Sequence, residues 1–468
     1  MIFYSLLAVV LLSPLPYGAN RPWSWSLCAL LIALLAMAWA VRFFVQKRQT
    51  PFFRHFAAIG DAAVLFFVAL AWACMQTTGY ISGPHPLWQM QNELLSFSAG
   101  AISLNPADTV TSIMRLLSYA LVFWLALCYG QDSRKARSVF YGLMVAGFIY
   151  AVYGLIIQLG DFRMVLWRER SYAGSVSSTF INRNHFATFA GLTLLCSLAL
   201  LSERMQTMGE YNLSGNLGKQ RFIESLITRA WFPLLAFFTI GSALILSYSR
   251  GGFLSVSLAL LAFLLLFYVN PRTRNKNTLI IFGSLILLGA IIFFVSSEAL
   301  LDRFGRLDEE SKIRTTVYDL TWNSILSNPW AGFGLGSYEE AFHLYQSMDI
   351  SGNEVTPMIH DYAHNTYLEA VFELGLPAAL ALFYGFVKIA WICFKGFLNR
   401  KRDMIFPAIG VAATVLIGAH SLIDFSMQIP AVSYAYALLM GVACAQSFSS
   451  SAQSRTLKAK KWPDYAAA

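Results

Sequence analysis

Residues 230–269 read AWFPLLAFFTIGSALILSYSRGGFLSVSLALLAFLLLFYV, and Arg250 is the one charged side chain in this run. The segment Ser249-Arg250-Gly251-Gly252 divides it into two apolar stretches, each near the ~20 residues that a helix needs to cross a bilayer. Glycine permits a tight turn between them. The run therefore predicts two membrane-spanning helices joined by a short polar turn.

The same pattern recurs along the chain. Of its 468 residues, 57% are hydrophobic and 13% are charged, with a mean hydropathy of +0.55. Soluble domains carry about 25% charged residues, so an ordinary soluble enzyme is excluded. We predict an all-α polytopic membrane protein with about twelve transmembrane helices. Their expected ranges are 2–17, 23–45, 58–78, 110–130, 138–159, 185–202, 230–248, 251–269, 278–296, 366–394, 405–424 and 430–447.

Basic residues predict the orientation of these helices. Most of the 34 Lys and Arg residues lie in alternate loops and in the tail. Cytoplasmic loops collect Lys and Arg, so these loops and both termini are expected in the cytoplasm. Orientation also accounts for the net charge of +9, and no nucleic-acid partner is predicted. Residues 297–365, between the ninth and tenth helices, then form one large loop on the outer side.

Loops of this length are usually functional or disordered, and we interpret this one as folded and functional. The alternative is a solvated connector whose aromatic side chains rest on the membrane surface. Arg250, at the outer turn, carries five donors that suit a phosphate or a carboxylate. It could equally serve as an interfacial anchor. The polar segment 178–187 could cap the sixth helix through Asn184 or line a substrate cavity.

The densest group of reactive side chains is His360-Asp361-Tyr362-Ala363-His364-Asn365-Thr366-Tyr367-Leu368-Glu369. If this segment is helical, His360 and His364 share one face. The pattern is similar to the His-Glu-x-x-His zinc signature, with Glu369 or Glu373 as a third ligand. Aspartate in place of glutamate shortens the reach of the expected base. We therefore predict no metal and no cofactor. The Gly332-Phe333-Gly334-Leu335-Gly336 run lacks the context of a phosphate-binding loop and predicts a tight turn.

Four pieces of sequence carry a resemblance to the O-antigen ligase and polymerase superfamily of bacterial envelope glycosyltransferases. They are Ser249-Arg250-Gly251-Gly252; Arg314 with Trp322 and the turn at 328–336; His364-Asn365 ahead of Gly375; and His420-Ser421-Leu422-Ile423-Asp424-Phe425 ahead of Pro430. The resemblance implies three regions. Residues 1–180 hold the first five helices and an arginine-rich outer loop, 181–448 form the catalytic membrane region with the periplasmic loop 297–365, and 449–468 form a basic cytoplasmic tail.

The resemblance also implies an activity. The expected reaction moves a glycan from an undecaprenyl-diphosphate carrier to a hydroxyl on a glycan or lipid acceptor, such as the lipopolysaccharide core. It would take place among the lipids of the bacterial inner membrane, at a site facing the periplasm.

The residue types suit that chemistry. Arg250 and Arg314, with Arg183 as a third, are expected to neutralise the diphosphate. His364 is expected to act as general base, because neighbouring arginines favour its neutral form. Asn365 is expected to orient a sugar, and a direct inverting displacement is the simplest mechanism.

Several alternatives stay open at this point. His420 and Asp424 are interpreted as a structural pair within one helix and are left out of the site. An O-antigen or exopolysaccharide polymerase would use the same donor, and so would a protein O-glycosyltransferase. A transporter or flippase for an anionic lipid or sugar is the rival from another class, but it predicts polar residues spread along several helices near the membrane midplane. A zinc protease is the last alternative.

Overall fold

The structure is a computed structural model. It describes residues 1–45, 52–79, 85–88, 90, 100–170, 174–208, 224, 228, 230–270, 283, 298–346, 352–353, 356–357 and 361–448. The predicted helix at 278–296, apart from residue 283, and the tail 449–468 lie outside these ranges. The described residues are helical except for loops and two antiparallel strand pairs. These are β1 (Met164–Val165) with β2 (Arg168–Glu169) and β3 (Gly352–Asn353) with β4 (Thr356–Pro357).

Seven helices of the described residues are long and apolar enough to cross a membrane. They are α2 (Pro22–Val45), α3 (Phe52–Gln76), α5 (Pro106–Tyr129), α6 (Ser133–Leu159), α7 (Arg183–Met208), α10 (Arg250–Val269) and α15 (Leu376–Asn399). Four shorter apolar helices join them: α1 (Ile2–Leu12), α9 (Trp231–Leu246), α16 (Ile405–His420) and α17 (Pro430–Ala445). The prediction of an all-helical, multi-pass membrane protein is confirmed. The total of twelve crossings stays a prediction.

The bundle is built around α17, in which every residue is buried. Its sequence, PAVSYAYALLMGVACA, is rich in small side chains, which let neighbouring helices approach closely. At Gly441 an added Cβ atom would lie 2.5 Å from the carbonyl oxygen of Phe123 in α5. On the outside of the bundle, α2 exposes Leu27, Leu30 and Leu34. Exposed leucines on a helix flank are expected where lipid covers that flank.

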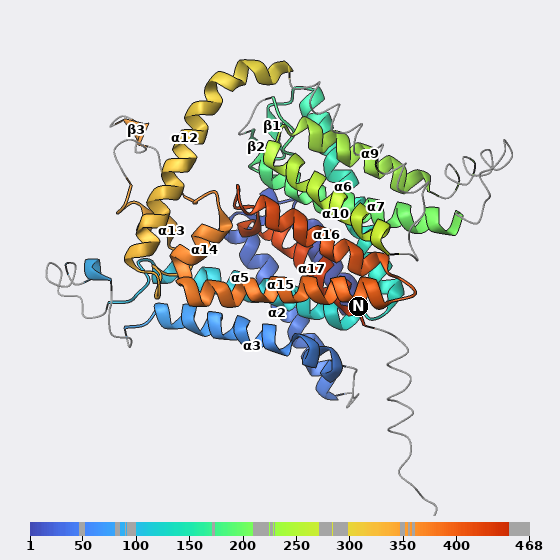
Figure 1. Ribbon diagram of the computed structural model, residues 1–468, viewed down its shortest axis with the longest axis horizontal. Helices are drawn as coiled ribbons and strands as arrows, with labels where there is room; N and C mark the ends of the chain where they lie inside the picture. The colour runs from blue at the N-terminus through green and yellow to red at the C-terminus, as the bar shows by residue number, and fades with distance from the viewer. Residues whose placement is uncertain are drawn as a thin grey trace, which may run out of the picture.

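One end of the bundle is covered by the large predicted loop. Here α12 (Glu298–Ser327) runs across the ends of the long helices, together with α13 (Tyr338–Phe342) and α14 (Thr366–Leu374) (Figure 1). Side chains from these three helices and from the glycine-rich turn bury one another in a separate hydrophobic cluster. It contains Val317, Ile325, Phe333, Tyr338, Ala341, Phe342, Ala363 and Phe372. The described part of this loop is therefore folded.

The predicted helix 366–394 is wrong at its start, because the chain breaks at Gly375. Gly375 has φ +76°, and the membrane-length helix α15 begins only at Leu376. The residues before this break are hydrogen-bonded to the glycine-rich run 332–336. The carbonyl groups of Phe372 and Glu373 accept hydrogen bonds from the N–H groups of Phe333 (3.0 Å) and Gly334 (2.9 Å).

The Gly332–Gly336 run forms the predicted tight turn, with positive φ at all three of its glycines. At Gly332 a Cβ atom would lie 2.3 Å from the carbonyl oxygen of Glu373, so a side chain cannot fit. The side chain of Gln76, at the end of α3, donates to the carbonyls of Ala331 (2.7 Å) and Glu373 (2.9 Å). The turn thus attaches the segment that contains α12, α13 and α14 to a long helix.

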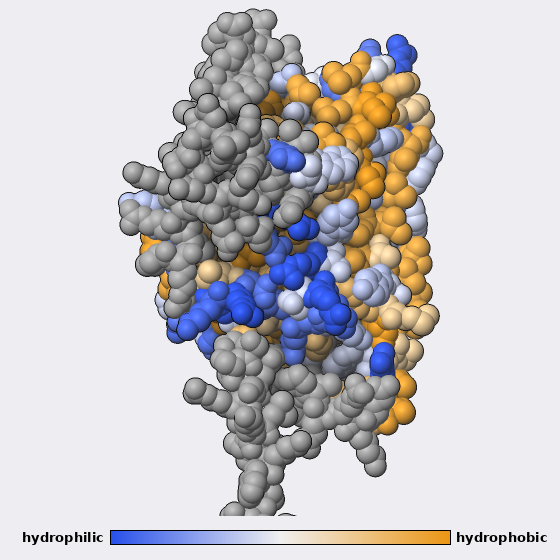
Figure 2. Space-filling model, turned by 90° about the vertical axis from the view of Figure 1, so that its right-hand side faces the viewer, coloured by the Kyte–Doolittle hydropathy of each residue, from blue (hydrophilic) through white to orange (hydrophobic). Residues whose placement is uncertain are grey.

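The opposite end of the bundle carries an ion-pair cluster. Arg137 near the start of α6 contacts Glu203 (2.6 Å) near the end of α7 and Asp403 (2.9 Å) between α15 and α16. Figure 2 looks onto this end and shows hydrophilic residues gathered beside hydrophobic helix flanks. The loops that contain these residues, all predicted to be cytoplasmic, therefore meet at one end, away from α12. Which side of the membrane each end faces stays a prediction.

Candidate functional site

Two helix starts meet at the end of the bundle that α12 covers. Ser249 caps α10, because its Oγ accepts a hydrogen bond from the Gly252 N–H (3.2 Å), and the same hydroxyl donates to Asn184 Oδ1 (2.8 Å). Asn182 Oδ1 accepts from the Asn184 N–H (2.8 Å) at the start of α7. The capping residue is therefore Asn182, and the interpretation of Asn184 as the cap is wrong. Asn184 instead joins α7 to α10.

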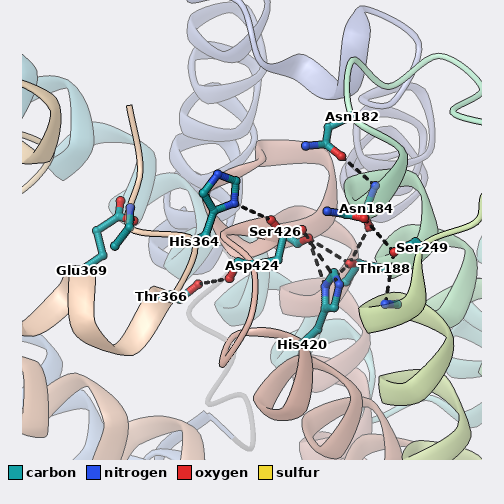
Figure 3. A network of polar contacts seen from close by, with 12 residues as sticks. Asn182, Asn184, Thr188, Ser249, His364, Thr366, Glu369, His420, Asp424 and Ser426 are labelled. Carbon is teal, nitrogen blue, oxygen red and sulfur yellow. Dashed lines mark hydrogen bonds and ion pairs between the residues drawn. The ribbon is translucent and has the colours of Figure 1, made fainter. Parts of the chain in front are cut away.

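A buried polar network continues from these helix starts to the loop between α16 and α17 (Figure 3). Thr188 Oγ1 lies 2.7 Å from His420 Nδ1 and 3.0 Å from Ser426 Oγ. The Ser426 hydroxyl lies 2.9 Å from Asp424 Oδ2, to which it donates. All four side chains are buried. The network fixes one carboxylate oxygen of Asp424 and leaves the other, Oδ1, for a different partner.

That partner is His364. Its Nδ1 lies 3.7 Å from Asp424 Oδ1, within ion-pair range but longer than a direct hydrogen bond. Among the described residues, neither of these two buried atoms has a hydrogen-bond partner. The His364 side chain is 34% exposed and that of Asp424 is 1% exposed. The buried carboxylate of Asp424 therefore faces the partly exposed imidazole of His364.

This pairing is what the sequence did not predict. The spacing of His420 and Asp424 pointed only to a contact between those two, and they do lie 3.9 Å apart. No sequence signal links Asp424 to His364, since sixty positions and the three helices α14, α15 and α16 separate them. The structure places Asp424 between the two histidines.

His364 itself adopts an unusual backbone. Its φ is +51°, in the left-handed region that costs a non-glycine residue roughly 1–2 kcal/mol. Tyr318 of α12 donates to the His364 carbonyl (3.0 Å), and Thr366 bonds to the backbone of Ser421 (2.9 Å) and of Asp424 (3.0 Å). Backbone strain that neighbours hold in place is typical of functional sites.

The zinc interpretation required His360 and His364 on one helix face. His364 lies outside α14, which begins at Thr366, so the expected helical face is absent at this histidine. His360 falls outside the described residues. Across the ranges that are described, no three His, Cys, Asp or Glu side chains are placed to hold a metal ion.

Asn365 caps α14. Its Oδ1 accepts hydrogen bonds from the N–H groups of Tyr367 (3.0 Å) and Leu368 (3.1 Å). A contact to a sugar would therefore use the amide nitrogen. The role of Asn365 in orienting a sugar stays a prediction.

The three predicted phosphate ligands lie on elements that border this network. Arg250 is the first residue of α10, and an added Cβ atom at the adjacent Gly251 would lie 3.5 Å from the His420 ring. Arg314 precedes Tyr318 by one turn of α12, and its charge acts on both Tyr318 and His420. Arg183 begins α7, beside the capping Asn182. Their shared function stays a prediction.

The electrostatic surroundings of Asp424 favour the charged form of its carboxyl group. Burial opposes ionisation of Asp424, but the neighbouring His364 and the Phe425 N–H hold its pKa below the usual range. The carboxylate is therefore ionised near neutral pH. Burial raises the pKa of Tyr318 despite the opposing charge of Arg314, so its hydroxyl stays protonated and donates to His364.

Replacement of Asp424 by asparagine tests the pairing. The variant keeps the shape of the side chain but removes the charge that orients and stabilises a protonated imidazole. We expect transfer to fall by about 10–10²-fold, because the imidazole loses the charge that orients it. The measurement is the rate of glycan transfer in membranes. An unchanged rate would show that Asp424 does not act through His364.

Part of the chain is similar to a known protein family. The chain is a multi-pass helical membrane protein with a polar site at one end. A family model described as O-Antigen ligase matches residues 235–383, which confirms the resemblance to the O-antigen ligase and polymerase superfamily over that region. The matched region contains Arg250, Arg314, His364 and Asn365, whereas Arg183 and Asp424 lie outside it. No curated protein matches the sequence.

Proposed function

We propose that the protein transfers a glycan from a lipid-diphosphate carrier to an acceptor hydroxyl, with inversion at the anomeric carbon. The observation that carries the proposal is the pair of His364 and Asp424. A partly exposed imidazole presents Nδ1 to a buried carboxylate at the same end of the bundle where the arginine-bearing helices begin. The family match, which spans His364, supports a transferase of this kind.

In the proposed reaction, the acceptor oxygen attacks the anomeric carbon as its proton passes to Nε2 of His364. A proton on Nδ1, directed at Asp424, leaves Nε2 as the free acceptor, because a neutral imidazole carries one proton. The carboxylate then stabilises the imidazolium that forms. The bond from the anomeric carbon to the phosphate oxygen breaks, and the lipid diphosphate leaves with the electron pair.

The leaving group needs charge neutralisation and not protonation. Guanidinium groups bind phosphate oxygens in two places, and such donors act strongly in a site with little water. Arg250 and Arg314, with Arg183, are the proposed ligands of the diphosphate. Undecaprenyl diphosphate is the proposed carrier, with the site at the periplasmic face of the bacterial inner membrane and both termini in the cytoplasm.

A transporter is less well supported. Among the described residues, the ion pair of Asp61 with Lys388 lies along the long helices, joining α3 to α15. Both side chains are partly exposed on the bundle flank and are not enclosed in a central pathway. The buried network around Asp424 lies instead at one end.

A ligase and a polymerase share the donor, and analysis of glycans from a deletion strain separates them. We expect deletion of a ligase to leave complete polymer on the lipid carrier, while the final acceptor lacks polymer. Single repeat units on the final acceptor would instead identify a polymerase, which is the alternative. Wild-type levels of every carrier-linked and acceptor-linked glycan would overturn the proposed function. The matched control is the same strain that expresses the chain from a plasmid.

A further inference from the structure

Glu369 lies in the first turn of α14 and is 1% exposed. Its Oε2 accepts a hydrogen bond from the backbone N–H of Ala363 (3.1 Å), the residue before His364. Its Oε1 accepts from the side-chain amide of Gln428. Gln428 ends η2 (Ser426–Gln428), the short helix whose first residue hydrogen-bonds to Asp424. One carboxyl group thus touches both segments that carry the His364 and Asp424 pair.

The contacts explain why a carboxyl group stands at this position. Two N–H donors converge on it from segments far apart in the sequence, and a carboxyl group offers one oxygen to each. The pair it joins is loose, with 3.7 Å between His364 Nδ1 and Asp424 Oδ1. A small shift of either segment would therefore separate the two groups.

Glu369 cannot itself receive the proton of an acceptor hydroxyl. It is sealed from solvent, and both of its oxygens already accept hydrogen bonds. Charged and titratable groups around it are Glu373 on its own helix, Arg115 on α5, Tyr362 seven residues earlier in the chain and Tyr338 on α13. Burial, and then the charge of Glu373, raise the pKa of Glu369 well above its usual range. Glu369 therefore acts through its hydrogen bonds to Ala363 and Gln428.

We infer that Glu369 is a positioning residue, which holds the His364 segment and the Asp424 loop at the separation that the proton transfer requires. The inference rests on the proposed function. It also gives a role to a side chain that the sequence offered only as a third metal ligand.

The first test compares alanine and glutamine at position 369 in purified enzyme with a lipid-linked glycan donor. Glu369→Ala should lower kcat by about 10–10²-fold, the effect of a displacement near 1 Å, and leave the donor KM within about twofold. Glu369→Gln should recover most of the rate, because glutamine can replace both contacts. Its amide oxygen accepts from the Ala363 N–H, and its amide nitrogen donates to the Gln428 side-chain oxygen once the Gln428 amide has rotated. The matched control is Glu339→Gln on α13, an exposed carboxyl group outside these contacts, which should keep kcat within about twofold.

A double-mutant cycle separates positioning from general stability. If Glu369 acts through the His364 and Asp424 pair, the effects of the two substitutions should not add. The kcat of the Glu369→Ala/Asp424→Asn double variant should then be little lower than that of the less active single variant. Losses that multiply would overturn the inference. If Glu369→Ala fails to accumulate in membranes, Gln428→Ala removes one of the two contacts and must show the same fall in kcat and the same lack of additivity.

The outcomes also separate this inference from the proposed function. If the wild-type protein transfers no glycan, or if transfer persists without His364, the proposed function fails. If transfer requires His364 but is unchanged in both Glu369→Ala and Gln428→Ala, only the positioning role of Glu369 fails.

Discussion

Transfer is expected to fall by about 10²–10⁴-fold when His364 is replaced by alanine, the range that loss of a general base costs. The acceptor hydroxyl would then have no group to take its proton, and Asp424 would remain as a buried carboxylate without the imidazole. The measurement is incorporation of glycan into the acceptor in membranes, with the carrier-linked donor quantified in parallel. We expect the donor to accumulate.

The control for this variant is His343→Ala. His343 also lies in the segment between α12 and α14, at the end of α13, but it is exposed and its ring contacts Gln346. We expect transfer by His343→Ala to stay within about twofold of the wild-type rate, as for exposed positions outside a site. Normal product from His364→Ala, in protein present at wild-type abundance, would remove His364 from the mechanism.

The second large loss of activity is expected on replacement of Arg250. Replacement by alanine should lower kcat/KM by about 10²–10³-fold, the cost of removing one donor that stabilises developing negative charge. Replacement by lysine keeps the charge but loses the planar fork, so we expect an intermediate rate. The residue starts α10 directly after the capping Ser249, which allows either substitution without loss of the cap.

Transfer kinetics with increasing donor concentration measure this effect. The matched control is Arg163→Ala, because Arg163 is an exposed arginine beside β1 and outside the network. We expect this control to keep kcat/KM within about twofold. Equal losses for Arg163→Ala and Arg250→Ala would indicate a general effect of surface charge and would contradict a specific role for Arg250.

Local sequence predicted the parts of the fold that depend on local chemistry. Apolar stretches such as 251–269 became helices because a segment without polar side chains must satisfy its backbone internally in lipid. The Gly332–Gly336 turn was predictable because glycine adopts positive φ angles without a steric penalty. The start of α15 was not, since the break at Gly375 depends on hydrogen bonds from Phe333 and Gly334, some forty residues earlier.

The sequence by itself therefore determined a multi-pass helical protein and a polar turn at Arg250, and it offered His364 as a candidate base. Only the tertiary structure decided which groups lie together. It brought Asp424 to His364, made Asn182 and not Asn184 the cap of α7, and gave Glu369 a contact with each segment of the pair. The physical reason is that helix formation follows from neighbouring residues, whereas the partner of a buried polar group is set by packing between segments distant in the chain.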